Sequence, residues 1–205
     1  MAARLTRILV FAREPAPGKA KTRLIPALGE EGAARLARLM LGHALMQAAG
    51  ADIGPVELVG DPHPDVWTQP VAGVATSAQV GADLGERMGE AAQRTLAAGE
   101  RPVITGTDCP GLNSARIAEA ARALETHDVT TIPATDGGYV LIGFARFDPS
   151  IFAGVKWGGD TVLAATLANI EGLGWSVWQG QPLADVDEPD DLIHVPPTWL
   201  VSEDR

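Results

Sequence analysis

Four basic residues lie within eleven positions near the start of the chain. The segment reads Arg13-Glu-Pro-Ala-Pro-Gly-Lys-Ala-Lys-Thr-Arg23 and contains two of the three lysines in 205 residues. The whole chain carries a formal charge of -10, so this concentration of cations opposes the overall field. A loop that combines free backbone donors with several cations is suited to binding phosphates. We predict a phosphate site here, rather than a solvated basic loop. Its predicted members are Arg13, Gly18, Lys19, Lys21 and Arg23.

Carboxylates suited to holding a metal ion occur at two later points of the chain. Asp108 follows the predicted strand that contains Val103-Ile-Thr. In open α/β sheets, ligands bind outside the carboxyl ends of the strands, which is the position expected for Asp108. Asp185-Val-Asp187 opens a second acidic cluster, and alternation along an extended segment turns both aspartates to one side. Magnesium is commonly held by one or two carboxylates together with substrate phosphates. We predict Asp108 and Asp187 as metal ligands. The alternatives are a turn-forming Asp108 and an Asp187 that belongs to a helix start.

Two further loops contain candidate site residues. In Gln79-Val-Gly-Ala-Asp-Leu-Gly85, the amide of Gln79 offers a donor and an acceptor to a nucleotide base. Gly81 in the same loop lets a ligand approach the backbone closely. In Ala134-Thr-Asp-Gly-Gly-Tyr139, Asp136 is a candidate base or substrate contact, although Asp-Gly-Gly is also common turn chemistry.

Composition limits the class of protein. A length of 205 residues fits one domain with a sizeable core. The acidic balance argues against a nucleic-acid or membrane-surface binder, since such proteins usually present a basic face. Cys109 is the single cysteine, which excludes an internal disulfide and a thiolate zinc cluster. No signal-length or membrane-length apolar run occurs, so we expect a soluble cytoplasmic protein.

Strand and helix patterns alternate along the chain. This order predicts an α/β fold with a mostly parallel sheet, covered by helices on both faces. Periodic apolar residues predict helices over about 30–49, 83–98 and 161–170, and a further helix capped by Asn113 or Ser114. Apolar runs predict strands at 7–12, 56–60, 102–106, 129–133, 139–144 and 175–178, with another short stretch at 71–75.

With these segments in order, the chain resembles a bacterial family of small glycosyltransferase-like proteins, catalogued as a domain of unknown function and associated with radical-SAM and selenodomain genes. The matching segments span nearly the whole chain. They are Phe11-Ala-Arg-Glu-Pro-Ala-Pro-Gly-Lys-Ala-Lys-Thr-Arg-Leu24, Asp83-Leu-Gly-Glu-Arg-Met88, Gly106-Thr-Asp-Cys-Pro-Gly111, Asp136-Gly-Gly-Tyr139 and Asp185-Val-Asp187.

The resemblance implies a single Rossmann-like, three-layer domain of the nucleotide-diphospho-sugar transferase (GT-A) type. More distantly, the chain resembles 2-phospho-L-lactate guanylyltransferase and the molybdenum-cofactor guanylyltransferases. By this resemblance the first loop binds nucleotide phosphates and Gln79 reads the base, while Asp108 and Asp187 hold Mg²⁺ or Mn²⁺. One departure from the pattern of sugar-nucleotide enzymes is that only Gly-Thr-Asp108 follows the central strand, in place of a full Asp-x-Asp.

The expected activity is a metal-dependent transfer that uses a nucleotide. We favour nucleotidyl transfer, with guanylyl as one candidate, from a nucleoside triphosphate to a small phosphorylated acceptor. In that reaction Lys21 and Arg23 neutralise the leaving pyrophosphate, beside Asp108 and its metal. Glycosyl transfer from a nucleotide sugar is the alternative, and Asp136 would then serve as the base. A non-catalytic nucleotide-binding module is a second alternative. The sequence does not predict an oligomeric state.

Overall fold

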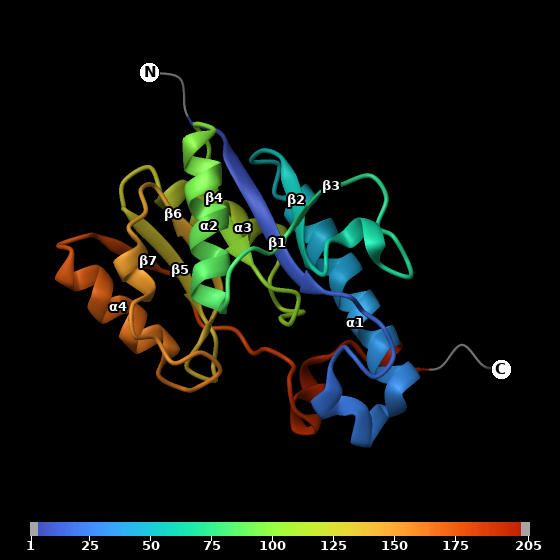
Figure 1. The fold of residues 1–205 in the computed structure, drawn as a ribbon. Coiled ribbons are helices and arrows are strands. Elements are labelled where there is room, and N and C mark those ends of the chain that lie inside the picture. Colours follow the sequence, from blue (N-terminus) through green and yellow to red (C-terminus); the bar gives the residue numbers. More distant parts are fainter. Residues whose placement is uncertain (1–3, 202–205) are drawn as a thin grey trace.

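The computed structural model describes residues 4–201, and its centre is one seven-stranded sheet (Figure 1). The strand order across the sheet is β3-β2-β1-β4-β6-β5-β7. The strands are β1 (Thr6–Arg13), β2 (Val56–Asp61), β3 (Ala75–Ala78), β4 (Arg101–Thr105), β5 (Val129–Pro133), β6 (Tyr139–Phe144) and β7 (Val177–Gln179).

Most neighbouring strands run parallel. Antiparallel pairing involves only β6, which pairs with β4 on one side and with β5 on the other. The sequence explains this exception, because Gly137-Gly138 forms a tight turn that returns the chain directly from β5 into β6. The parallel strands β1, β2 and β4 therefore end at one edge of the sheet, where the loops after β1 and β4 meet.

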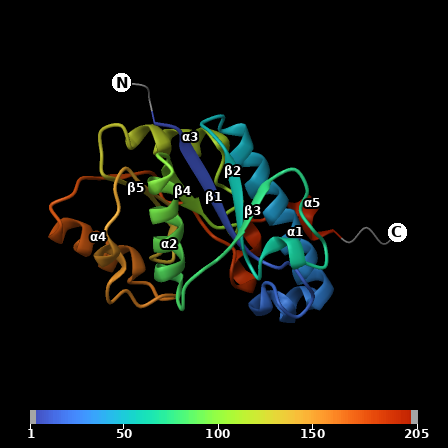
Figure 2. The same cartoon turned by 45° about the horizontal axis from the view of Figure 1, so that its top comes forward.

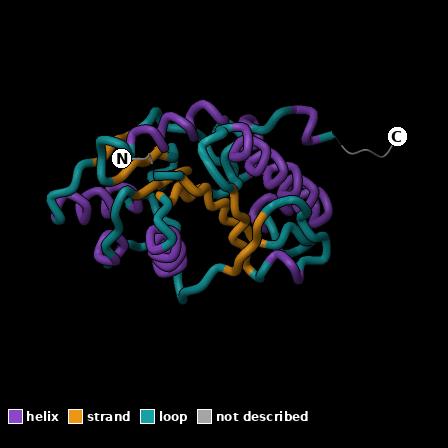
Figure 3. Tube along the Cα trace, turned by 90° about the horizontal axis from the view of Figure 1, so that it is seen from above, coloured by secondary structure: helices purple, strands orange, loops and turns teal. Residues whose placement is uncertain are grey.

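Helices cover both faces of the sheet, as Figures 2 and 3 show from two further directions. Alternate residues of β1 divide between the faces. Ile8 and Val10 pack in the core beneath α1 (Ile25–Gly50) and α3 (Ser114–Ala123). Leu9 packs on the opposite side with α2 (Leu84–Ala97) and α4 (Val162–Gly172). This arrangement confirms the expected mostly parallel α/β fold with three layers.

Two helix starts follow from local capping. The side chain of Asp83 accepts a hydrogen bond from the backbone N–H of Glu86, at 2.9 Å, which sets the start of α2. Asn113 caps α3 in the same way through the N–H of Arg116, at 3.1 Å. A capping side chain typically stabilises a helix by about 1 kcal/mol, because it satisfies a donor that the helix leaves free.

Three predicted boundaries differ from the structure. The first helix begins at Ile25 rather than near residue 30, and Gly29 interrupts it with φ 70°. A glycine in this conformation separates the first turn from the long part of the helix, which begins near residue 30 as predicted. The predicted strand at 71–75 is wrong, because β3 occupies Ala75–Ala78. The last strand is Val177–Gln179, slightly later than predicted.

A third apolar cluster joins the two ends of the chain. Leu24 and Leu36 on the N-terminal side pack with Val186 and Val195 on the C-terminal side, and all four are buried. In Figure 1 the red C-terminal segment accordingly lies beside the blue start of α1. After Asp187, the chain forms a short 3-10 helix (Pro189–His194), which Glu188 and Asp191 begin with reciprocal capping contacts. The acidic residues after Asp187 therefore begin this helical turn.

A search of residues 4–201 for a membrane-spanning helix found none that is both long and apolar enough.

Candidate active site

Lys21 lies at the centre of the candidate site. Its backbone adopts φ 48° and ψ 45°, a left-handed conformation that non-glycine residues rarely adopt. Backbone strain of this kind is concentrated at functional sites. The side chain is only 8% exposed, although lysine ammonium groups usually remain in water. The loop thus holds one cation inward at some conformational cost.

The ammonium group of Lys21 contacts both predicted metal ligands. Its Nζ lies 2.8 Å from Oδ1 of Asp108 and 3.5 Å from Oδ1 of Asp187. It also donates a hydrogen bond of 2.6 Å to the carbonyl oxygen of Val186. The structure therefore brings together three residues that are separated by up to 166 positions in the chain.

Two features of the backbone place the carboxylates at this point. Asp108 lies in the loop after β4, and its carbonyl oxygen accepts a hydrogen bond of 2.8 Å from the N–H of Val186. Val186 is itself fully buried in the third apolar cluster. Because Asp185 and Asp187 flank this buried residue, both aspartates are directed away from that cluster, toward the site.

The other cations of the first loop occupy different positions around Lys21. Arg23 Nη1 lies 2.6 Å from Oδ2 of Asp187, and its Nε lies 3.5 Å from Glu188. Lys19 is mostly exposed and pairs with Glu14 at 3.1 Å. Arg13 ends β1 and is exposed at the rim of the same cleft. Gly18 has φ 72°, which favours glycine, and it allows the turn that precedes Lys19.

Gln79 lines the same cleft as the basic loop. The amide nitrogen of Gln79 donates to the carbonyl oxygens of Ala12 and Val59, each at 3.1 Å. Its oxygen lies 3.4 Å from Nη1 of Arg87. In the conformation described, Gln79 thus connects the ends of β1 and β2, and reading a base would require it to exchange at least one of these partners.

Gly81 is the position in this loop where the backbone requires glycine. It has φ 142°, and a Cβ there would lie 2.7 Å from the backbone nitrogen of Arg87. Arg87 holds the loop in turn, since its Nε donates to the carbonyl oxygen of Gly81 at 3.1 Å and its Nη1 pairs with Asp61 at 2.8 Å. Sequence reasoning did not single out Arg87 as a site residue, although it lies within the motif Asp83-Leu-Gly-Glu-Arg-Met88.

Asp136 lies in the turn between β5 and β6. One of its carboxylate oxygens accepts a hydrogen bond of 2.9 Å from the N–H of Gly138, which is the turn role that the sequence left open. The residue also lines a pocket together with Asp108 and Asp185, so the turn contact leaves it within the candidate site. Asp185 was noticed in the sequence but was not assigned a role there.

The site residues line two adjoining hollows. A cleft of about 730 Å³ contains the cations of the first loop, Gln79, Arg87, Asp108 and Asp187. Thr22, Thr107 and Trp157 also line this cleft, and sequence reasoning did not predict a role for the two threonines. A smaller pocket of about 240 Å³ contains Asp136 and Asp185. Asp108 lines both hollows and therefore marks their junction.

Asp108 and Asp187 form a candidate donor pair for a divalent cation. Asp108 and Asp187 each place a carboxylate oxygen within 3.5 Å of the same ammonium, so both reach one locus. Within residues 4–201, no group of three or more His, Cys, Asp or Glu side chains is arranged to hold a metal ion. Two carboxylates fit Mg²⁺ or Mn²⁺ when nucleotide phosphates and water complete the coordination, which is the usual arrangement for magnesium.

Cys109 and His43 have structural rather than chemical surroundings. Burial raises the pKa of the Cys109 thiol to about 11, so the thiolate required of a nucleophile is disfavoured. His43 Nε2 lies 3.1 Å from the carbonyl oxygen of Pro110, and its ring packs against Trp199. His43 thus supports the loop that contains Asp108, as expected of a packed histidine.

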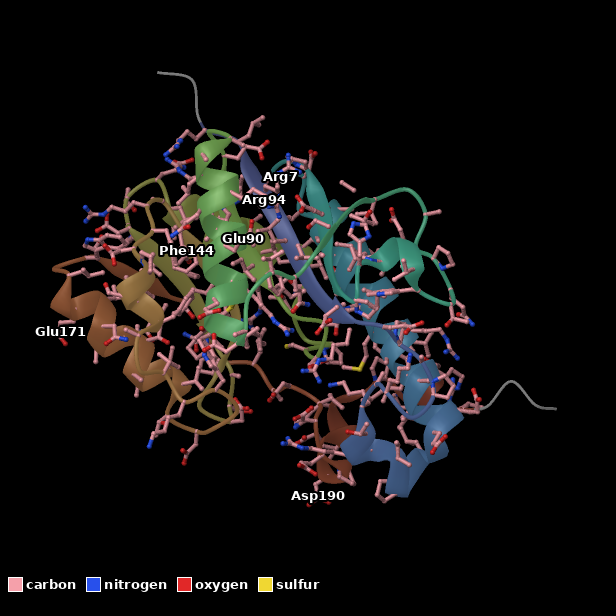
Figure 4. The ribbon with its side chains drawn as sticks, in the orientation of Figure 1. Arg7, Glu90, Arg94, Phe144, Glu171 and Asp190 are labelled. Carbon is pink, nitrogen blue, oxygen red and sulfur yellow. The ribbon has the colours of Figure 1, made fainter. Side chains whose placement is uncertain are left out.

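A second ionic cluster lies at the opposite end of the strands. Glu57 is 4% exposed and contacts Arg94 at 2.8 Å and Arg7 at 3.4 Å. Figure 4 shows Arg7 and Arg94 side by side near the start of β1 and the end of α2. Neither residue lines the cleft. These arginines neutralise a buried carboxylate and join β1 to β2 and α2, so we assign them a structural role.

Glu14 lies within the basic loop and connects it to Thr68. Its carboxylate accepts hydrogen bonds from the N–H and hydroxyl of Thr68, both at 2.8 Å, and pairs with Lys19. These contacts, led by the backbone N–H of Thr68, lower the pKa of Glu14 from 4.5 to about 2. A lowered folded-state pKa means that the stabilisation is complete above 4.5 and is lost as the pH falls toward about 2.

We therefore expect Glu14→Gln to lower the free energy of unfolding at neutral pH. The difference from the parent chain should shrink as the pH falls from 4.5 to about 2, because the parent carboxylate then becomes protonated. Denaturant unfolding over this pH range measures the effect. Glu31→Gln, at an exposed position of α1, is the matched control. Equal pH dependence of both variants would contradict the assignment.

Comparison with known proteins places the chain in a family and supports the fold. A family model with the description "Uncharacterized protein conserved in bacteria (DUF2064)" matches residues 34–159, which is more than half of the chain. The chain belongs to the DUF2064 family. This match confirms the bacterial family expected from the sequence segments. The association with radical-SAM genes and the likeness to guanylyltransferases stay predictions. No curated protein matches the chain.

Solved structures provide a second comparison, which concerns the fold. A protein from Desulfovibrio desulfuricans G20, provisionally assigned as a nucleotide-diphospho-sugar transferase, matches with TM-score 0.85 and 33% identity over 96% of this chain and 88% of that chain. CMP:2-keto-3-deoxy-manno-octonic acid synthetase in complex with CTP matches with TM-score 0.59 and 12% identity, covering 93% and 96% of the two chains. Rv0371c from Mycobacterium tuberculosis H37Rv, in complex with manganese, matches with TM-score 0.57 and 16% identity, covering 98% and 100%. The expected nucleotide-diphospho-sugar transferase fold is confirmed.

Proposed function

We propose that this protein is a divalent-metal-dependent transferase that uses a nucleotide, and that it transfers a nucleotidyl group from a nucleoside triphosphate to a small phosphorylated acceptor. One observation carries the proposal. Lys21 is buried in the cleft between Asp108 and Asp187, with the remaining cations of its loop around it. Cations and carboxylates at the ends of different strands are both satisfied by a nucleotide phosphate with its metal ion.

The cations of the first loop would bind the phosphate chain. Lys21 and Arg23 lie closest to the carboxylates, so they suit the β- and γ-phosphates and the leaving pyrophosphate. Lys19 and Arg13 lie at the rim and would attract and orient the nucleotide. Gln79 lines the same cleft, and Gly81 follows two residues later in its loop, so we propose that the base and ribose bind there.

Asp108 and Asp187 would hold Mg²⁺ or Mn²⁺. The metal ion would supply charge neutralisation to the phosphate oxygens as negative charge develops. Lys21 has to leave at least one carboxylate before both can bind a metal ion, and an incoming phosphate offers its ammonium a new partner. We therefore propose that the metal ion and the nucleotide bind together.

The bond changes in this reaction are simple. An oxygen of the acceptor phosphate would attack the α-phosphorus, and the bond between the α-phosphorus and its bridging oxygen to the β-phosphorus would break. Because an acceptor phosphate is already ionised, no general base is needed. The protein would act mainly by positioning and by neutralising charge, as is usual for phosphoryl chemistry.

Glycosyl transfer from a nucleotide sugar is a second candidate. It is favoured by the relative from Desulfovibrio desulfuricans G20, which is 33% identical over 96% of this chain. In this reaction a hydroxyl acceptor would lose its proton to Asp136, which lines the pocket next to Asp108. The leaving group would then be a nucleoside diphosphate rather than pyrophosphate.

Nucleotide binding and product release distinguish these candidates. We expect Mg²⁺ with a nucleoside triphosphate, GTP included, to raise the melting temperature of the purified protein, because a ligand that binds only the folded state stabilises it. The same mixtures with small phosphorylated acceptors should release pyrophosphate. Release of nucleoside diphosphate from a nucleotide sugar would instead support glycosyl transfer. Absence of any thermal shift with every nucleotide would contradict both enzymatic functions.

A further inference from the structure

The smaller pocket continues the cleft toward the middle of the sheet. Phe11, Leu84, Gly106 and Asp108 line both hollows, so a group bound in the pocket would lie directly beside the proposed nucleotide site. Its volume of about 240 Å³ is below the usual range for drug-sized ligands, about 300–1,000 Å³. The pocket therefore suits the body of a small acceptor.

Most of the pocket wall is apolar. Met88, Ile104, Val140 and Ile142 contribute to it from α2, β4 and β6. Among the described residues 4–201, those that line the pocket include no Lys, Arg or His. Three carboxylates provide its charged groups, namely Asp108, Asp136 and Asp185. This charge distribution is the reverse of that in the adjoining cleft.

The three carboxylates differ in their partners. Asp108 is paired with Lys21 in the structure and is a proposed metal ligand. Asp136 uses one oxygen to accept from Gly138 and makes no ion pair within residues 4–201. Asp185 makes no ion pair with the described part of the chain.

Backbone hydrogen bonds hold Asp185 at the same pocket as Asp136. The segment before Asp185 pairs with the end of β5, where Leu183 donates a backbone hydrogen bond to Pro133 and accepts one from Thr135, each at 3.0 Å. These contacts hold two carboxylates against the same pocket. Two like charges beside one pocket favour a positively charged partner and oppose another anion.

We propose that this pocket binds the acceptor and that it selects an acceptor whose body has an ammonium group. This inference rests on the proposed function and specifies its substrate class. The phosphate of the acceptor would remain at the junction marked by Asp108, beside the cations of the cleft. Its short body would enter the apolar pocket, and its ammonium group would donate hydrogen bonds to Asp136 and Asp185.

Three compounds of nearly equal size test the charge preference. O-Phosphoethanolamine has an ammonium group, 2-hydroxyethyl phosphate has a neutral hydroxyl, and phosphoglycolate has a carboxylate at the same position. Calorimetric titration with Mg²⁺ and a non-hydrolysable nucleoside triphosphate should give the tightest binding for the ammonium compound. We expect at least about a tenfold difference in Kd from phosphoglycolate, the equivalent of about 1.4 kcal/mol. Equal affinities, or a preference for phosphoglycolate, would overturn the proposal.

A charge-removing variant assigns the preference to the pocket. Asp185→Asn retains the shape of the side chain and should reduce the ratio of ammonium to neutral affinity by at least about threefold. Asp190→Asn is the matched control, since Asp190 is exposed at the outer edge of the molecule in Figure 4 and does not line the pocket. Circular dichroism and nucleotide-induced thermal shift report whether each variant is folded. A folded Asp185→Asn variant with an unchanged ratio would overturn the assignment to Asp185.

The titrations are repeated without nucleotide, so that the two proposals fail separately. Nucleotide binding without any ammonium preference would overturn the acceptor class and leave the transferase proposal in place. Ammonium preference in a protein that binds no nucleotide would contradict the transferase proposal, and with it the assignment of this pocket to an acceptor.

Discussion

Asp108→Asn should lower the metal-dependent turnover of the purified protein by about 10²- to 10³-fold, the size of effect found when one stabilising group is removed from a catalytic centre. Asn retains the shape of the side chain but loses the negative charge that attracts a divalent cation. Because Asp108 is also the junction between the cleft and the pocket, the substitution affects the point where nucleotide and acceptor would meet. Pyrophosphate release under saturating Mg²⁺ measures the loss.

The effect on the fold should be small. The side chain of Asp108 is 50% exposed, so its pairing with Lys21 is screened by water and contributes little to stability. The melting temperature without ligand should therefore remain close to that of the parent chain. Asp190→Asn, an exposed carboxylate outside both hollows, should retain full turnover. A folded Asp108→Asn protein with parental turnover would remove Asp108 from the mechanism.

Lys21→Met should change two measurements in opposite directions. Turnover should fall by about 10²-fold or more, because the cation nearest to the proposed phosphate site is lost. Binding of Mn²⁺ in the absence of nucleotide should become tighter, because the ammonium group no longer competes for Asp108 and Asp187. Electron paramagnetic resonance of free Mn²⁺ measures the second quantity without requiring turnover.

Lys156→Met is the matched control for this substitution. Lys156 is the only lysine outside the first loop, it is exposed, and it does not line the cleft. The control should retain the parental values of turnover and Mn²⁺ affinity. The loss of Lys21 should destabilise the fold less than the ~3–5 kcal/mol seen when a buried ion pair is broken, since both carboxylates are about half exposed. Unchanged Mn²⁺ affinity in a folded Lys21→Met protein would contradict the proposed competition.

The fold was largely predictable from local patterns. Apolar runs such as that of β1 and periodic helices such as α2 are determined by residues that are neighbours in sequence, and the structure confirms them. Two predicted elements were displaced from their positions in the structure. Gly29 hid the first turn of α1, and the apolar stretch before residue 75 misplaced β3.

The proximity of Asp108 to the basic loop was also predictable, for a topological reason. In a sheet of parallel strands, loops that follow the strands meet at one edge, so a basic loop after β1 and Asp108 after β4 were expected to lie close together. Their meeting at Lys21 agrees with this expectation. Their catalytic and metal-binding roles stay predictions.

By itself, the sequence determined the α/β fold, the charge of the first loop and the identity of the carboxylates beside it, because these depend on residue type and local period. Only the tertiary structure decided that Lys21 is buried between Asp108 and Asp187, and that Asp185 faces Asp136 across an apolar pocket. Both arrangements depend on the path of residues 183–187. That path is held by hydrogen bonds to Asp108 and β5 and by burial of Val186 against α1, and such long-range contacts leave no periodic signal in the chain.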